Sequence, residues 1–344
     1  MLRHLVIFYI RRKIITRKGV NMVDKVIGID IGGTNLRGAL VSREGGILKR
    51  MEISSQADQG IDKVIENLAG FIKDISEGEN VCNIGMGIPG IINSKDGVIT
   101  QAPNILNVDD YPLRAVLNEK LGSDINIVIE NDANSAAVGE WWMGASKDVN
   151  SMIMITMGTG VGGGLILDGK LWTGADGMAG EIGHITIYPD GAKCKCGNYG
   201  CLESYASATA IRRMVREGLE DKSLNTILRE STKNIEVEDI PQIVMEAAGA
   251  GDGFSLGIWE EVGKALGIGI ASLINLLNIE MVVIGGGVSN AWDLFIDKTY
   301  EEARRRAFRA PMKRTKIQRG LLRDDAGILG SAHLALKSSN EKKP

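Results

Sequence analysis

Apolar residues near the start of the chain fall into short runs, each ended by glycine or by a polar turn. Five of these runs predict strands, at residues 26–31, 37–41, 47–53, 83–88 and 125–129. The segment Glu44-Gly45-Gly46 separates two of them by a turn that is typical of a hairpin. The first third of the chain is therefore expected to be rich in β-structure.

Other segments place apolar residues at helical spacing. Seven positions predict one buried helix face: Ile61, Val64, Ile65, Leu68, Phe71, Ile72 and Ile75. A longer stripe predicts a second large helix: Trp259, Val262, Leu266, Ile270, Leu273 and Leu277. Residues 113–121 and 326–336 also have a helical pattern. Helices and strands thus alternate along the chain, which predicts an α/β fold.

The order of strand, glycine turn and hairpin occurs twice, over residues 26–41 and 153–171. In the second copy a strand at 151–156 is followed by the glycine-rich segment 157–164, a short strand at 165–167 and a turn at 168–169. No low-complexity linker separates the copies. This layout predicts two related lobes joined by short segments.

Three glycine clusters each follow a predicted strand, where exposed N–H groups can approach phosphates. They are Asp30-Ile31-Gly32-Gly33-Thr34-Asn35, Gly158-Thr159-Gly160 and Gly285-Gly286-Gly287. Any one cluster alone could be a tight turn. The glycine spacing within 158–163 fits a dinucleotide fingerprint, but a strand and a hairpin follow it instead of a helix. The chain also has no Walker A motif.

Three of the four cysteines lie close together, ten residues after a histidine. His184, Cys194, Cys196 and Cys201 form a complete Cys3His ligand set for zinc. The spacing alone is also compatible with two alternatives to zinc binding: a disulfide, or cysteines that are simply small buried residues. Glu181 and Glu203 bracket the set and suggest a site for a ligand rich in hydroxyl groups. The fourth cysteine, Cys82, is expected in the core.

Composition is that of a globular protein, with 44% hydrophobic and 24% charged residues and a net charge of −3. Residues 1–21 hold six Lys and Arg and no acid, so the remainder is more acidic still, which argues against nucleic acid as a partner. We expect residues 1–23 to be a basic leader that is disordered or untranslated, with translation from Met22; a basic interfacial anchor is the alternative. No apolar run reaches membrane length, which predicts a cytoplasmic protein.

At this point the motifs resemble those of the ROK sugar kinases and sugar-responsive repressors, over roughly residues 26–336. The similar segments are the three glycine clusters, Ala102-Pro103-Asn104, Glu130-Asn131-Asp132-Ala133-Asn134, Glu181-Ile182-Gly183-His184 and 194–203. The resemblance implies an actin-like (ribonuclease H-like) ATPase fold, with ATP and sugar in a cleft between two α/β lobes. We expect the first lobe at 24–133 plus 324–340, and the second lobe, with the zinc site, at 134–323.

The resemblance also implies roles for the residues. Asp132 would be the general base, although its position before the helical segment 133–142 also suits a helix cap. The sugar would be held by Asn104, Asn131, Asp132, Glu181, His184 and Glu203. Zinc would be structural because four protein ligands leave no open position. Asp30 would orient the hydration shell of the Mg²⁺ that accompanies ATP.

The implied function is an ATP-dependent hexose kinase, with glucose as the leading substrate and the 6-hydroxyl as the attacking group. Fructose, mannose, N-acetylglucosamine and N-acetylmannosamine stay open. A sugar-sensing repressor would need a DNA-binding domain, and only 24 residues precede Lys25. An inactive scaffold would leave Asp132 and the glycine clusters unexplained. A homo-oligomer, dimer or tetramer, is expected from the family.

Overall fold

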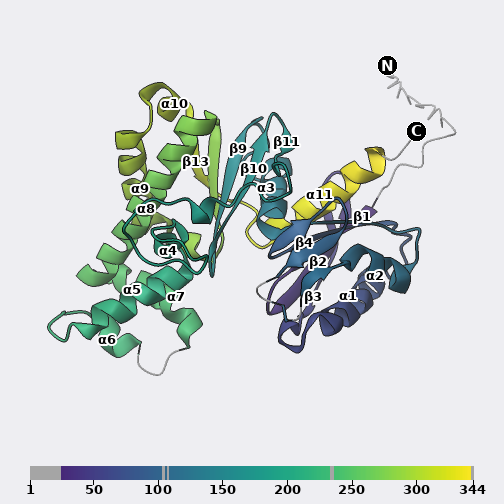
Figure 1. Ribbon diagram of the computed structural model, residues 1–344, viewed down its shortest axis with the longest axis horizontal. Helices are drawn as coiled ribbons and strands as arrows, with labels where there is room; N and C mark the ends of the chain where they lie inside the picture. Colours follow the sequence, from purple (N-terminus) through teal and green to yellow (C-terminus); the bar gives the residue numbers. More distant parts are fainter. Residues whose placement is uncertain (1–24, 103–104, 107, 233–235, 342–344) are drawn as a thin grey trace, which may run out of the picture.

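A computed structural model describes residues 25–102, 105–106, 108–232 and 236–341. The expectations for residues 1–23 and for Asn104 lie outside these ranges. Figure 1 shows two lobes, each built on a β-sheet, with one pair of helices between them. The predicted two-lobed α/β layout is therefore present.

The two large sheets have the same topology. The first has the order β3-β2-β1-β4-β8, with β1 (Lys25–Ile31), β2 (Asn35–Ser42), β3 (Ile47–Ser54), β4 (Asn83–Ile88) and β8 (Asn126–Asn131). The second has the order β11-β10-β9-β12-β13, with β9 (Met152–Met157), β10 (Val161–Leu167), β11 (Lys170–Leu171), β12 (Met281–Gly285) and β13 (Lys316–Arg319). In each sheet an antiparallel meander of three strands continues into two parallel strands. This topology confirms the repeat predicted from the sequence.

The predicted amphipathic helices also form. Helix α1 (Ile61–Ile75) buries all seven predicted positions against the first sheet, beside α2 (Leu113–Leu121). Helix α8 (Gly253–Leu277) begins earlier than the apolar stripe because the side chain of Asp252 accepts a hydrogen bond from the Ser255 N–H. Of the helices in the described ranges, none combines the length and apolar character needed to cross a membrane.

Several short elements had no strong sequence signal. A three-stranded sheet contains β5 (Ile91–Asn93), β6 (Val98–Gln101) and β7 (Asp109–Tyr111). The second lobe adds the helices α4 (Glu203–Ala206), α5 (Ala208–Glu220), α6 (Leu228–Ser231), α7 (Ile240–Gly249), α9 (Trp292–Arg306) and α10 (Arg309–Arg314). The three short strands and the helices α4, α6 and α10 do not produce a periodic pattern that can be distinguished from loops, whereas α5, α7 and α9 are long enough to have been predicted but were not.

Helices α3 (Asp132–Trp142) and α11 (Asp325–Glu341) lie between the lobes (Figure 1). Helix α3 packs on β9 and β10 of the second sheet, whereas α11 packs on β1 and β4 of the first. Where they cross, a Cβ on Gly139 would lie 2.0 Å from the Ala326 carbonyl oxygen, and one on Gly330 would lie 1.7 Å from that of Ser135. The two lobes therefore meet through a backbone-to-backbone contact that excludes side chains.

Two local expectations were wrong. Gly162, Gly163 and Gly164 belong to strand β10 instead of a turn, because their missing side chains let α3 pack closely; a Cβ on Gly164 would lie 2.6 Å from that of Ala137. Cys82 is exposed, because it precedes β4 in an irregular segment and lies outside the core.

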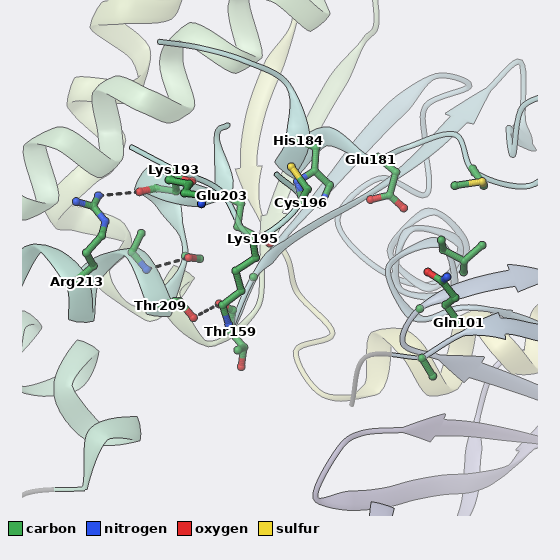
Figure 2. A pocket seen from close by; sticks show the side chains of 18 of the residues that line it. Gln101, Thr159, Glu181, His184, Lys193, Lys195, Cys196, Glu203, Thr209 and Arg213 are labelled. Carbon is green, nitrogen blue, oxygen red and sulfur yellow. Dashed lines mark hydrogen bonds between the residues drawn. The ribbon is translucent and has the colours of Figure 1, made fainter. Parts of the chain in front are cut away.

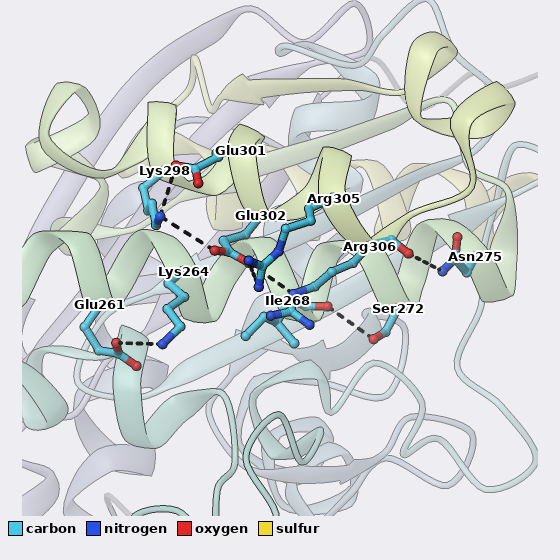
Figure 3. A network of polar contacts seen from close by, with 10 residues as sticks. All are labelled: Glu261, Lys264, Ile268, Ser272, Asn275, Lys298, Glu301, Glu302, Arg305 and Arg306. Carbon is cyan, nitrogen blue, oxygen red and sulfur yellow. Dashed lines mark hydrogen bonds and ion pairs between the residues drawn. The ribbon is translucent and has the colours of Figure 1, made fainter.

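The second lobe is stabilised at its outer surface by a charged network on α8 and α9 (Figure 3). The Glu302 side chain is almost fully buried and lies 3.1 Å from Arg306, 3.2 Å from Arg305 and 3.6 Å from Lys298. Burial opposes its charged form, but these cations keep the pKa of Glu302 below its ordinary value. The Asn275 amide donates to the Arg306 carbonyl and joins the two helices.

Acid is expected to destabilise the protein through His333. This α11 side chain stacks on Trp142 at 4.6 Å between ring centroids, and neither ring nitrogen has a hydrogen-bond partner. Burial, with the charge of Lys337, lowers the pKa of His333 from 6.5 to about 4. The unfolded state therefore binds more protons between these pH values, and stability falls as the pH falls through them. Urea unfolding should give a free energy about 2 kcal/mol lower at pH 5 than at pH 7 from this group.

The variant His333→Phe keeps the aromatic stacking and removes the titration. It should lose that share of the pH dependence, and an unchanged pH dependence would contradict the assignment to His333.

Candidate active site and metal centre

A cavity of about 1040 Å³ lies between the lobes and collects three of the six predicted sugar residues. The first lobe contributes Gln101 and Ala102, and the second contributes Glu181, His184 and Glu203. Figure 2 shows Gln101 across the cavity from Thr159 and Lys195. Carboxylate, amide and imidazole groups are suited to bind hydroxyl groups. The cavity is therefore suited to a polyhydroxylated ligand that contacts both lobes.

One wall of this cavity is the predicted metal centre. The ligand atoms of His184, Cys194, Cys196 and Cys201 all lie within 4.8 Å of one another. The thiols of Cys196 and Cys201 are 3.8 Å apart, and the Cys194 sulfur is 3.6 Å from His184 Nδ1. A tetrahedral site with zinc–sulfur bonds of about 2.3 Å places its sulfurs about 3.8 Å apart. The donor set therefore fits a tetrahedral zinc ion.

Local backbone contacts bring these ligands together. The Cys194 N–H donates to the Asn198 carbonyl at 2.8 Å, and isolated bridges pair Thr186 with Cys201 and Lys193 with Tyr199. Since Nδ1 of His184 faces the thiol, its Nε2 is the ring nitrogen left for another partner. The segment that carries the four ligands, residues 184–201, is called the metal loop below. It can thus present this histidine toward the cavity.

Glu203 connects the metal loop to the second glycine cluster. Its Oε2 accepts the Val161 N–H at 3.0 Å, and a Cβ on Gly160 would lie 2.3 Å from the same oxygen. A glycine is therefore required at 160. One carboxylate oxygen of Glu203 braces the glycine turn, and the side chain also lines the large cavity.

Helix α5 holds the same turn from its other side. The Ala208 N–H donates to the Gly158 carbonyl at 2.9 Å, and the Thr209 hydroxyl donates to the Thr159 carbonyl at 2.7 Å (Figure 2). Ser207 caps this helix through its side chain. The glycine turn is thus supported by α5 independently of the metal loop.

Strand β8 leads directly into helix α3 at Asn131 and Asp132. The residue that caps the helix is Asn131, whose side-chain oxygen accepts the N–H groups of Ala133 and Asn134. Its amide donates to the Gly90 carbonyl at 3.1 Å. Asp132 is the first helical residue, so the capping role weighed for it belongs to its neighbour, and its carboxylate faces a second cavity.

This second cavity has a volume of about 420 Å³ and brings Asp30 and Asp132 together with Gly285, Gly286 and Gly287. Burial, and then the charge of Asp132, raise the pKa of Asp30 to about 7, although Arg37 opposes the rise. Burial also raises the pKa of Asp132. The charge of Glu181 raises it further, whereas the hydrogen bond from the Ala133 N–H lowers it. Glu181 lines the large cavity, so the two cavities approach each other at these carboxylates.

The backbone conformation of Gly286 explains why the third cluster, at 285–287, requires glycine. Its φ is +84°, and a Cβ there would lie 2.5 Å from the Met157 carbonyl oxygen. Only glycine allows the chain after β12 to approach the end of β9 this closely. The clusters at 158–160 and 285–287 are therefore neighbours.

Some predicted residues line neither cavity among the described residues: Gly32, Gly33, Thr34, Asn35, Asn131 and Gly158. The Asn35 amide donates to the Glu52 carboxylate at 2.7 Å, and Gly32 donates back to the Asn35 carbonyl to close its turn. The first cluster follows the strand that carries Asp30, so it lies at the edge of the site and outside its lining.

The cavities also contain residues that the sequence analysis did not identify. In the second cavity these include Glu140, Thr156, Arg319, Arg323 and Asp324. One signal was available: positions 132, 136 and 140 share one helix face, as expected for a spacing of four. Arg319, Arg323 and Asp324 carry no such signal, because Arg319 ends the short strand β13 and the other two belong to the short connection that follows it.

The comparisons agree with this geometry. The ROK family model matches residues 26–338. A glucokinase from Thermotoga maritima is 36% identical and covers 90% of this chain and 96% of its own length, whereas a xylose repressor from Caldicellulosiruptor bescii is 34% identical over 90% of this chain and 77% of its own. A solved ROK family glucokinase from Streptomyces griseus, in complex with glucose and AMPPNP, is 32% identical with a TM-score of 0.75, covering 91% and 99%. The two lobes have the actin-like ATPase fold, and the chain belongs to the ROK family.

Proposed function

We propose that this protein is an ATP-dependent hexose kinase with glucose as its main substrate. The observation that carries the proposal is the position of Asp132, whose carboxylate lies in the cavity of Asp30 and Gly286 and within electrostatic range of Glu181 in the large cavity. A phosphate donor on one side and a sugar on the other would meet there. The similarity to glucokinases, one of them solved with glucose and AMPPNP, supports the same assignment.

Asp132 would accept the proton of the attacking sugar hydroxyl. A carboxylate with a raised pKa is better suited to this role than an ordinary aspartate, because its proton affinity is closer to neutral pH. Glu181, Glu203 and the Nε2 of His184 would hold other hydroxyls, together with Asn104 and the remaining N–H of Asn131. These contacts would orient the sugar for transfer.

The phosphate side would rely on backbone N–H groups and on one carboxylate. The turns at 158–160 and 285–287, with the edge cluster at 32–35, would approach the phosphates of ATP. Mg²⁺ bound with ATP supplies charge neutralisation for phosphoryl transfer. Asp30 would orient its hydration shell, and a cation beside Asp30 would favour the charged carboxylate.

We assign structural zinc to His184, Cys194, Cys196 and Cys201. The four donors complete a tetrahedron, so the ion would have no free position for catalysis. Its contribution would be to fix the loop that presents His184 and Glu203 to the sugar.

A panel of sugars tests the function directly. In a coupled assay for ADP release, glucose should give the highest kcat/KM, ahead of fructose, mannose, N-acetylglucosamine and N-acetylmannosamine. Mannose differs from glucose in the orientation of one hydroxyl, and a site that hydrogen-bonds a hydroxyl discriminates against a sugar that leaves its polar groups unpaired, so weaker turnover of mannose is expected. Absence of ADP release with every sugar would rule out the kinase.

A sugar-sensing repressor is the second candidate because repressors also occur among the relatives. A sensor needs the large cavity but has no use for Asp30, Asp132 and the glycine turns. ATP binding that is measurable by calorimetry, together with sugar-dependent ADP release, would favour the kinase over the sensor. A homo-oligomer also stays a prediction, which light scattering after size-exclusion chromatography can test.

A further inference from the structure

The chain passes between the lobes twice, and one buried side chain joins the two passages. The first passage runs from β8 directly into α3, and the second runs from β13 through 320–324 into α11. Glu140 lies on α3, about 12 Å along the helix from Asp132. It is 1% exposed, and no ion-pair partner occurs for it in the described part of the chain.

Both carboxylate oxygens of Glu140 accept backbone hydrogen bonds. Oε2 accepts the Ala145 N–H at 2.8 Å, just after α3, and Oε1 accepts the Leu322 N–H at 2.8 Å, in the second passage. Glycines surround the group: a Cβ on Gly144 would lie 2.0 Å from Oε2, and one on Gly320 would lie 2.9 Å from Oε1. The pocket is therefore shaped closely around a carboxylate.

Leu322 lies where the chain changes from one lobe to the other. Before it, the Gly320 N–H donates to the Ile284 carbonyl of β12 in the second lobe at 2.9 Å. After it, Asp324 pairs with Arg37 of β2 at 3.5 Å, and Asp325 accepts from Arg50 of β3 in the first lobe. Glu140 therefore holds the second passage at its midpoint.

We propose that Glu140 is a positioning residue that fastens the second passage to α3, so that the two passages keep a fixed relative position. The passage lines the smaller cavity through Gly320, Arg323 and Asp324, and α3 begins with Asp132. The bond between Glu140 and Leu322 therefore fixes the position of Asp132, at the start of α3, relative to the cavity wall near the end of that helix. This role rests on the proposed kinase function.

Hydrogen exchange in the ligand-free protein tests the link itself. In Glu140→Gln the amide nitrogen can no longer accept, so one of the two N–H groups loses its acceptor. At least one of the amides of Ala145 and Leu322 should therefore exchange about tenfold faster, or more, than in the wild type. Unchanged protection at both amides would overturn the proposal.

Steady-state kinetics test its consequence. Glu140→Gln should lower kcat about tenfold and change the glucose KM less than threefold, because the large cavity lies away from the passage. Gly320→Ala, which crowds Oε1 and keeps the charge, should act in the same direction with a smaller effect. It also replaces Glu140→Gln if that variant does not fold.

Glu280→Gln is the matched control. Glu280 also accepts two backbone N–H groups, from Asn150 and Ser151 at 2.9 Å each, but entirely within the second lobe. Because one oxygen of Glu280 accepts both N–H groups, the carbonyl oxygen of glutamine can keep both bonds. Exchange at those two amides should stay close to that of the wild type, and kcat should stay within twofold. An equal loss of kcat in this control, or normal kcat in Glu140→Gln, would reject the positioning role of Glu140. A wild type inactive on every sugar would reject the kinase, while the exchange result would still decide the link.

Discussion

Asp132→Asn is expected to lower kcat by about 10²–10⁴-fold, the usual contribution of a general base. Asparagine fits the same space but cannot accept the proton of the sugar hydroxyl. The fold should persist because Asn131, and not Asp132, caps α3. Steady-state assays with saturating glucose and ATP measure the loss, and circular dichroism checks the fold.

The same variant has a second readout that does not depend on turnover. The charge of Asp132 contributes to the raised pKa of Asp30, so removing it should move that pKa down from about 7. NMR titration of the Asp30 carboxyl can follow the shift. Asp293→Asn is a suitable control, since Asp293 also lies in the first turn of a helix but lines neither cavity. Full activity of Asp132→Asn would contradict the assignment of Asp132 as the general base.

Cys201→Ser is expected to release the metal and to lower kcat/KM for the sugar by roughly 100-fold, at the upper end of the range for disturbed metal shells. Cys201 is fully buried, and its loss removes one of four donors. His184 and Glu203 would then lose their fixed positions. The sugar KM should rise first, because α5 continues to hold the turn at 158–160.

Metal content by mass spectrometry, with separate KM values for sugar and ATP, measures this effect. The control variant Cys82→Ser, which removes an exposed thiol outside the metal site, should retain both metal and activity. Removal of the metal by a chelator should reproduce the Cys201→Ser pattern. A weaker ATP affinity with an unchanged sugar KM would contradict this role of the metal loop.

Features of the fold that repeat along the chain were predictable from sequence. The stripe from Ile61 to Ile75 gave the whole of α1, because one apolar face decides both the helix and its burial. The repeated strand and hairpin order gave two sheets of one topology. Glycines at 162–164 were placed in a turn, because nothing local reveals that a helix packs on their strand.

Residues of the site were likewise predictable where they lie close together in the sequence and unpredictable where they do not. The metal ligands span only 18 residues of sequence, from His184 to Cys201, and local turns bring them together, so their spacing predicted them. Glu140 and Asp324 line the same cavity only because two distant passages of chain lie side by side. Pairings of this kind depend on tertiary packing, which single-sequence patterns do not encode.

The position of α11 has a consequence for synthesis on the ribosome. The apolar residues Val26, Ala39 and Val41 of the first sheet are covered by Ile328 and Leu329, which are translated just over three hundred residues after the first of them. The second lobe is continuous in sequence and can fold earlier. Although domains usually fold from the N-terminus during translation, here the N-terminal lobe must finish last. Its uncovered sheet is the surface that a chaperone would have to protect while the rest of the chain emerges.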